Sequence, residues 1–207
     1  HTYYVTIDNG VLNLADGSFQ GVTKEDEWIF TTKSDMPELS DTLIVDATGK
    51  GDFNTVQGAL DFIPDFNERQ TVILVNPGDY EELVYARNKW NVKIKGAGMT
   101  DTKVHYANNE VFNPHPLTVK TNEWPGTFPS RRAAFMLDNC KDMIVEDITI
   151  ATDLKGQAEG LLLNGERIAL YRVHIIGSGD ALQANGTIYM ESCELDGGGD
   201  TMAVSYT

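Results

Sequence analysis

Short apolar runs recur in the second half of the chain, and their spacing is the feature that most restricts the fold. Runs that begin at Ile144, Ile168 and Ile188 are separated by 24 and 20 residues. Each run is rich in β-branched residues and ends in a polar or glycine-containing turn, as strands do. A repeat of this length is typical of a solenoid in which each repeat forms one coil. The spacing predicts a parallel β-solenoid with these three isoleucines stacked in one column.

An antiparallel sandwich is the alternative, because it is also built from short strands. A sandwich joins neighbouring strands through tight hairpins, and Asn-Gly is the strongest short signal for such a turn. Asn185 and Gly186 form this dipeptide between two apolar runs. The sandwich therefore stays open on pattern alone, although the regular spacing favours the solenoid.

One segment departs from the strand pattern. The sequence NTVQGALDFI at 54–63 places Val56, Leu60 and Ile63 at helical spacing, with Asn54 as the predicted N-cap and a proline beyond the end. The sequence therefore predicts one short helix ahead of the coils.

The first part of the chain alternates apolar and polar residues in two places. Alternation over 3–7 and 27–31, with Asp16 and Gly17 as a turn between them, predicts two or three short antiparallel strands within residues 1–33. Residues 34–42 are polar and contain a proline, which is typical of a linker.

The end of residues 1–33 resembles the closing strands of a bacterial immunoglobulin-like surface module. In that module an acidic-glycine turn is followed by a W-x-F-T-T ending. The corresponding residues here are Trp28, Phe30, Thr31 and Thr32. The earlier strands of such a module are missing from this sequence, so two interpretations stay open. The region is either a truncated module or a set of strands that packs on the domain at 43–207.

The chain carries a large excess of acidic residues, which limits its partners. Its formal net charge is −15, and this argues against nucleic acid and against an anionic membrane surface. A run of 18 or more apolar residues, the signature of a membrane span, is not found in the sequence. We therefore expect no membrane insertion. The two cysteines are too few for a disulfide framework and are compatible with a bridge or with two thiols.

Two aspartates near the C-terminal end are the strongest chemical signal. Asp180 and Asp200 each follow a glycine and an apolar strand, and Gln157 opens the strand before them. If these strands stack as successive coils, the two carboxylates meet on one face with the amide beside them. Close carboxylates divide into a nucleophile and an acid/base, and an amide can stabilise an oxyanion. The set indicates an enzyme that acts on an ester or a sugar, although aspartate is also common in glycine-rich turns for geometry alone.

Four motifs then carry a family resemblance, in the same order as in that family. They are LIVDATGKGDFNTVQGALDFIP at 43–64, VILVNPGDYEE at 72–82, KGAGMTDT at 95–102, and the strands from Gln157 to Met202. This part of the chain resembles the pectin methylesterases, carbohydrate esterase family 8, and is similar to the bacterial members in particular. The resemblance implies an all-β fold, a right-handed parallel β-helix (a pectin lyase-like solenoid) with a short N-terminal capping helix.

The resemblance also implies roles for the three site residues. Asp180 in GDAL corresponds to the family's acid/base aspartate, Asp200 in GGGDT to its nucleophile, and Gln157 to an oxyanion-binding amide. It implies neither a metal nor another cofactor. The expected substrate is methyl-esterified pectin (homogalacturonan), acted on by a monomer that is secreted, periplasmic or at the cell surface.

The chain departs from the family pattern at several positions. Gly179 stands where the family has a second glutamine, and Gly199 stands where it has a valine before the nucleophile. Thr201, Met202 and Ala203 replace the residues after the nucleophile. The family's catalytic arginine and substrate-stacking tryptophan would lie beyond Thr207. We therefore expect a chain truncated at both ends, nearly inactive by itself.

These departures leave two alternatives to an active esterase. One is a catalytically impaired β-helix that binds pectic polysaccharide. The other is a polysaccharide lyase, which would need a calcium-binding carboxylate cluster, and only Asp196 and Asp200 are candidates for one.

The remaining candidate residues are interpreted as structural. We expect Tyr80 to pack the first coil and His174 to be structural. His105 and His115 are expected to lie in a polar loop and to be neither ligands nor catalysts. Trp124 and Phe128 lie in a long loop at 108–131, which could stack on sugar rings. Arg131 and Arg132 are interpreted as solvated.

Overall fold

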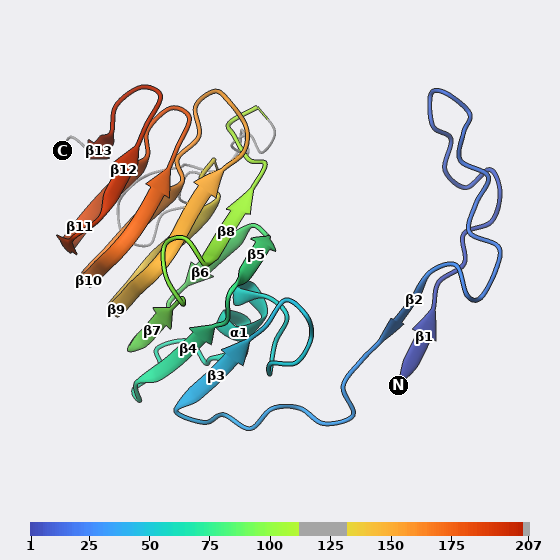
Figure 1. The fold of residues 1–207 in the computed structure, drawn as a ribbon, viewed down its shortest axis with the longest axis horizontal. Helices are drawn as coiled ribbons and strands as arrows, with labels where there is room; N and C mark the ends of the chain where they lie inside the picture. Colours follow the sequence, from blue (N-terminus) through green and yellow to red (C-terminus); the bar gives the residue numbers. More distant parts are fainter. Residues whose placement is uncertain (112–131, 205–207) are drawn as a thin grey trace. The chain divides into compact units, whose positions relative to one another are not determined.

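The computed structural model describes residues 1–111 and 132–204 of the chain. It divides into two compact units, His1–Glu38 and Leu39–Thr207, which are shown in Figure 1. In the part of the chain that the structure describes, no helix is long and apolar enough to cross a membrane.

The first unit is a small antiparallel ribbon. β1 (Thr2–Tyr4) pairs with β2 (Ile29–Thr31), and the rings of Tyr3 and Phe30 stack with centroids 5.4 Å apart. Gly17 has a φ of 66°, which suits the turn expected at that position. The antiparallel pairing is therefore confirmed, with strands shorter than the alternation indicated. The likeness to an immunoglobulin-like module stays a prediction.

The second unit consists of strands that wind in one direction, and every strand pair described in it is parallel. The strands are β3 (Thr42–Val45), β4 (Thr71–Val75), β5 (Gly78–Glu81), β6 (Val84–Arg87), β7 (Val92–Lys95), β8 (Thr102–Tyr106), β9 (Phe135–Thr152), β10 (Leu161–Ile176), β11 (Leu182–Glu191), β12 (Glu194–Asp196) and β13 (Met202–Val204). Figure 1 shows the larger arrows side by side with the same direction. The fold is a right-handed parallel β-helix, so the sandwich is excluded.

Each full coil has three faces, and β9 shows all of them. Its first part pairs with β6, its middle with β7 and its last part with β8. We call these the first, second and third face. The first face continues from β9 through the first residues of β10 and β11 to β13. On the third face, β12 pairs with the last residues of β10.

Polar residues turn the chain at the corners of the coils. Asn88 and Asn139 end the first face in left-handed conformations, with φ values of 59° and 51°, which asparagine tolerates better than most residues. The two side chains meet across neighbouring coils, where Asn139 Nδ2 donates to Asn88 Oδ1 at 2.6 Å. The next corner has Asp147 and Arg172 at φ values of 57° and 51°, joined by an ion pair.

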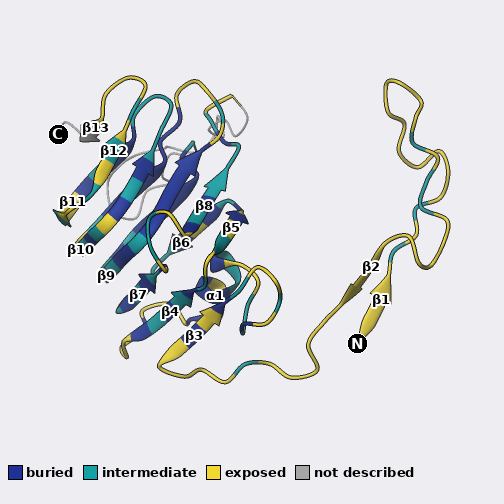
Figure 2. Ribbon diagram, viewed as in Figure 1, coloured by how far each residue is buried: buried dark blue, intermediate teal, exposed yellow. Residues whose placement is uncertain are grey.

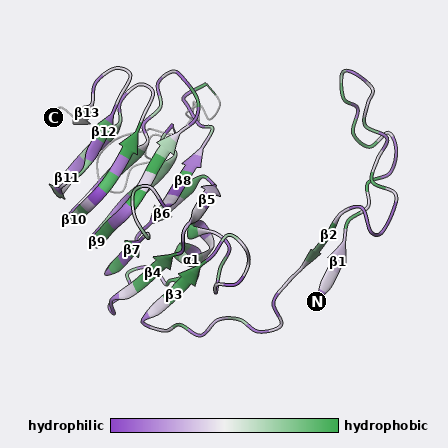
Figure 3. Cartoon of the chain, viewed as in Figure 1, coloured by the Kyte–Doolittle hydropathy of each residue, from purple (hydrophilic) through white to green (hydrophobic). Residues whose placement is uncertain are grey.

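The interior of the coils is filled by aliphatic side chains, shown in dark blue along β9 and β10 in Figure 2. Figure 3 shows hydrophobic positions along the same strands. The interior column on the second face contains the buried Met143 and Ile168 and the partly buried Ile188. Ile144 instead pairs with Ala169, so the predicted column of three isoleucines is wrong at one coil. The ladder shifts register between Asn164 and Gly165, and a shift of one residue moves a side chain to the opposite face.

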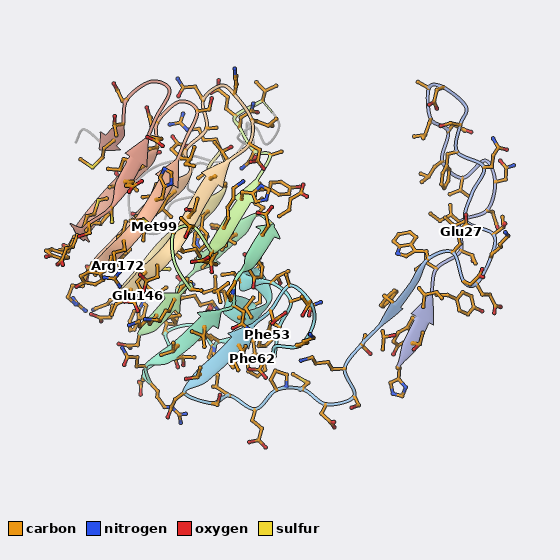
Figure 4. All side chains as sticks on the ribbon, viewed as in Figure 1. Glu27, Phe53, Phe62, Met99, Glu146 and Arg172 are labelled. Carbon is orange, nitrogen blue, oxygen red and sulfur yellow. The ribbon has the colours of Figure 1, made fainter. Side chains whose placement is uncertain are left out.

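The predicted helix is α1 (Val56–Phe62), and it covers the N-terminal end of the coils. Its N-cap is Thr55 rather than Asn54, since the Thr55 hydroxyl accepts from the Gly58 N–H at 3.0 Å. The Glu82 carboxylate accepts from the N–H groups of Val56 and Gln57, both at 2.8 Å. The start of the helix is therefore fixed by the chain between β5 and β6. Figure 4 shows Phe53 and Phe62 together beside the helix.

Both cysteines are free thiols. Cys140 is buried in the core, and burial raises the pKa of its thiol to about 12. That thiol is therefore unreactive at neutral pH.

Candidate active site

Two glycine-rich turns stack on each other where the chain enters the first face. Leu182 pairs with Met202 in parallel register, and the Gly199 N–H donates to the Gly179 carbonyl at 2.6 Å. Asp180 and Asp200, one residue beyond these glycines, therefore hold equivalent positions on consecutive coils.

The glycines allow the two turns to approach this closely. A Cβ atom at residue 198 would lie 2.2 Å from the Ser178 carbonyl oxygen on the other turn. Within the first turn, a Cβ atom at residue 177 would lie 1.8 Å from the Asp180 carbonyl oxygen. These distances leave no room for a side chain, so backbone meets backbone at this point. The glycines are required by packing, whereas the aspartates beside them are not.

Gln157 lies on the preceding coil, directly next to Gly179. The N–H groups of Ser178 and Gly179 both donate to the Ala158 carbonyl, at 2.9 and 3.3 Å. A Cβ atom at residue 179 would lie 3.1 Å from Gln157 Oε1, so the Gln157 amide occupies the space beside that glycine. The three predicted site residues thus lie on three successive coils.

The site residues differ in exposure. Gln157 and Asp200 are exposed, and Asp180 is half-buried. All three are therefore accessible from outside the coils, as a site for a polymeric substrate requires. Adjacent parallel strands lie about 4.8 Å apart, so carboxylates on neighbouring coils are within reach of one small substrate group.

A buried ion pair beside Asp180 was not foreseen from the sequence. The Glu159 side chain is 0% exposed and that of Arg132 is 23% exposed. Arg132 Nε lies 2.7 and 2.9 Å from the two Glu159 carboxylate oxygens, and Nη2 lies 2.5 Å from Oε1. The prediction that Arg132 is solvated is therefore wrong. The one available signal was an acidic residue at the entry of the apolar run GLLL, where a buried carboxylate needs a cation.

The charges of Arg132, Glu159 and Asp180 influence one another. Burial raises the pKa of Glu159 above its ordinary value, the bonds and charge of Arg132 oppose that rise, and the charge of Asp180 adds to it. Burial alone would lower the pKa of Arg132, but the contacts with Glu159 raise it, with added effects of Asp180 and Glu110. The charge of Asp180 thus acts on both members of the pair.

The histidines lie in ion pairs at the edges of the third face. His105 is in β8 rather than in a loop, with Nε2 at 2.9 Å from Asp79 and Nδ1 at 2.5 Å from Asp153. His174 Nε2 lies 2.8 Å from Asp196 Oδ2. Both histidines bridge neighbouring coils. The His174–Asp196 pair lies at the start of the aspartate turns, since the Gly177 N–H donates to the Asp196 carbonyl at 2.8 Å.

Other predicted residues have structural positions or lie outside the description. Tyr80 is buried in the first coils, where its hydroxyl donates to the Asn76 carbonyl at 2.8 Å. His115, Trp124, Phe128 and Arg131 lie outside the described residues. Within the described ranges, no group of three or more His, Cys, Asp or Glu side chains is arranged to hold a metal ion.

Comparison with known proteins covers the β-helical part. The family model described as Pectinesterase matches residues 42–203. Pectinesterase QRT1 of Arabidopsis thaliana is 28% identical over 192 residues, which is 86% of this chain and 49% of the relative. Pectinesterase 31 of the same plant is 30% identical over 161 residues, covering 75% of this chain and 50% of the relative.

Solved structures show the same fold. The pectin methylesterase from carrot has a TM-score of 0.60 at 22% identity, covering 77% of this chain and 47% of that chain. Pectin methylesterase PemA from Erwinia chrysanthemi has a TM-score of 0.55 at 19% identity, covering 73% and 48%. The chain spans about half the length of the curated relatives that it matches. With most of its residues matched by the family model, the chain belongs to the pectinesterase family.

Proposed function

We propose that this chain carries the central catalytic residues of a pectin methylesterase, which hydrolyses methyl esters of homogalacturonan to pectate and methanol. The observation that carries the proposal is the stacking of Asp180 and Asp200 on consecutive coils with Gln157 beside them. Membership of the pectinesterase family supports the reaction class.

In the first half of the reaction, the Asp200 carboxylate attacks the carbonyl carbon of the methyl ester. The amide N–H of Gln157 donates to the oxyanion of the tetrahedral intermediate. The C–O bond to the methoxy group then breaks, and protonated Asp180 gives its proton to the departing methanol. The product of this half is an acyl-enzyme anhydride on Asp200.

In the second half, a water molecule attacks the acyl-enzyme. Asp180, now a carboxylate, takes a proton from that water as a general base. The anhydride bond breaks, Asp200 leaves as a carboxylate, and the substrate is released as a carboxylic acid that ionises by giving its proton to solvent. Asp180 thus gives one proton to methanol and takes one from water, whereas Asp200 exchanges none.

Gly179 supports a low rate for this reaction. The missing glutamine removes one hydrogen-bond donor to the oxyanion, and losing such a donor costs on the order of 3 kcal/mol of transition-state stabilisation. The chain would then rely on Gln157 for that contact. The rate would be reduced without a change in mechanism.

The acidic charge fits a methylated substrate better than the product. Highly methylated pectin is nearly neutral, whereas pectate is a polyanion that a chain with a net charge of −15 repels. We infer that the protein acts as a monomer outside the cytoplasm, in the secreted, periplasmic or cell-surface compartment where pectin is met. Its assignment to the bacterial type of the family stays a prediction.

A second candidate function is pectin binding without turnover. It is favoured by Gly179 and by the residues that replace the family pattern after Asp200. A lyase has less support, because Asp196 already pairs with His174 and does not stand free for a calcium cluster with Asp200.

Methanol release from highly methylated pectin tests the proposal. A full-length protein that contains residues 1–207 should release methanol without added metal, slowly for a pectinesterase, whereas the isolated 207-residue chain should be nearly inactive. Absence of release together with measurable binding of the same pectin by calorimetry would favour the binding protein.

A further inference from the structure

The pair formed by Arg132 and Glu159 lies on the coils next to Asp180. The Ala134 N–H donates to the Glu159 carbonyl at 3.1 Å, and the Gly160 N–H donates to the Ala181 carbonyl at 3.0 Å. The backbone therefore steps from the Arg132 segment to Glu159 and then to Asp180 on successive coils, about 4.8 Å per step. Glu159 is the residue between the cation and the aspartate in this stack.

Stability alone gives no reason for burying this pair. Removing two charges from water is costly, and replacing a buried ion pair with apolar residues is often neutral or stabilising. The coil interiors nearby are filled by aliphatic residues such as Leu161 and Leu182. A charged pair retained at this position is therefore better explained by its effect on a neighbouring group, and the nearest site residue in the stack is Asp180.

The guanidinium group of Arg132 has donors beyond those that Glu159 uses. The contacts with Glu159 engage Nε and Nη2, and a guanidinium has five N–H donors in a rigid fork. Among the described residues, no hydrogen bond of Nη1 is found, so its N–H groups can meet a further acceptor there. The charge of Asp180 contributes to the raised pKa of Arg132, which supports their proximity.

We propose that Arg132 and Glu159 form a positioning pair that balances the charge of Asp180 during the reaction. Arg132 stabilises the anion that forms when Asp180 gives its proton to methanol. Glu159 neutralises Arg132 beforehand, so that the cation does not hold Asp180 ionised before the ester is cleaved. The catalytic consequence rests on the proposed function, whereas the electrostatic coupling of the three residues does not.

Several charged groups surround Asp180, and the test must distinguish the effect of the pair from the effects of the others. Arg132 and Glu159 approach from the two preceding coils and Asp200 from the next coil. Glu110 also acts on Arg132. Asp200 and Glu110 remain unchanged when the pair is altered, so a difference in the titration of Asp180 reports on the pair.

The test is NMR titration of the Asp180 carboxyl carbon in the full chain. In Glu159→Gln the cation is no longer neutralised, so the titration midpoint of Asp180 should move to lower pH. In Arg132→Met the cation is lost, so the midpoint should move to higher pH. Opposite shifts distinguish coupling from a general loosening of the fold. Shifts in the same direction, or no shift in either folded variant, would overturn the proposal.

Each single variant leaves a buried charge without its partner and can fail to fold for that reason. A double variant keeps the test decisive in that case. Arg132→Met with Glu159→Gln removes both charges and should fold, with an Asp180 midpoint between those of the single variants. Arg167→Met is the matched control, because it breaks a bidentate arginine pair with Asp142 on the exposed surface and should leave Asp180 unchanged.

Methanol release by the same proteins tests the catalytic consequence. Glu159→Gln, in which the unneutralised cation holds Asp180 ionised, should lose kcat about tenfold, part of the roughly 10²–10⁴ that a positioned acid/base supplies, with KM for methylated pectin unchanged, and the double variant should lose less. A folded Glu159→Gln variant with the kcat of the unaltered protein would refute the positioning role. Failure of the unaltered protein to release methanol would instead refute the proposed function, and the NMR shifts would still decide the coupling.

Discussion

At the scale of single residues, the two aspartates have roles that separate experimentally. Asp200→Asn removes the nucleophile and should reduce methanol release at least about 10³-fold. Asp180→Asn removes the proton donor and should reduce it about 10²–10⁴-fold. Asp142→Asn makes the same chemical change at an exposed corner, where asparagine also tolerates the φ of 54°. It should keep normal activity, and equal losses in all three variants would contradict the assignment.

Gly179 provides a second test at this scale. Gly179→Gln restores an amide beside Asp180 and should raise kcat, by up to about 10²-fold if it reaches the oxyanion. The new Cβ would lie 3.1 Å from Gln157 Oε1 and 3.2 Å from Gln157 Cα, so Gln157 must move slightly. Gly179→Ala introduces the same contact without the amide and serves as the control. A rate no higher with glutamine than with alanine would show that the lost donor does not limit turnover.

At the scale of elements, the start of α1 depends on a carboxylate from the neighbouring coil. Burial raises the pKa of Glu82, against the effect of the Gln57 and Val56 N–H groups. A carboxyl with a raised pKa in the folded state binds protons more strongly there, so its contribution to stability is largest at low pH and declines as pH rises through the raised pKa. Glu82→Gln removes that dependence.

The measurement for Glu82 is urea unfolding at pH 4 and pH 7. The difference in unfolding free energy between the unaltered protein and Glu82→Gln should be larger at pH 4. Thr55→Ala is the control, because the Thr55 hydroxyl caps the helix and does not titrate. It should lower the unfolding free energy by about 1 kcal/mol at both pH values. A Glu82 difference that grows toward pH 7 would contradict the raised pKa of its carboxyl.

The charged residues of the second face give the opposite pH dependence. Glu146 lies 2.7 Å from Lys93 and 2.9 Å from Lys95, and Figure 4 shows it beside Arg172. Burial would raise the pKa of Glu146, but the two lysines lower it below its ordinary value. Its contribution is therefore present above the unfolded pKa and is lost as pH falls through the folded pKa.

Glu146→Gln should lower the unfolding free energy by about 1–3 kcal/mol at pH 7, since it leaves Lys93 and Lys95 with a weaker, uncharged acceptor. The loss should shrink in acid, as followed by urea unfolding between pH 3 and pH 7. Glu166→Gln is the control, because that side chain is 65% exposed with only long contacts to Lys141 and Arg167. A larger effect at Glu166 than at Glu146 would contradict the role of burial.

At the scale of the whole molecule, the negative charge should set the response to salt. Screening weakens repulsion between exposed charges over about 10 Å at 0.1 M salt. Added salt should therefore lower KM for sparsely methylated pectin, whereas KM for highly methylated pectin should change little. Methanol release at about 10 and 150 mM salt checks this. Equal salt responses for the two substrates would show that net charge does not select between them.

The sequence by itself determined the local features of the protein. The strand spacing, the helix near 54–63, the aspartate turns and the order of the family motifs follow from neighbouring residues. Local periodicity and turn chemistry carry such information, since they act over a few residues. The expectation that Asp180, Asp200 and Gln157 lie on successive coils also came from the repeat, and the stacking agrees with it. Their catalytic roles stay a proposal.

Only the tertiary structure decided register and pairing. Met143 rather than Ile144 joins the interior column, because the register of the ladder shifts at a corner between coils. The spacing of apolar residues in the sequence does not show how many residues a corner contains. Arg132 meets Glu159, and His105 meets Asp79 and Asp153, through contacts between coils. The partner of a charged side chain is a residue at the same position on a neighbouring coil. The number of residues between the two is set by the length of the coil, and no local sequence pattern specifies it.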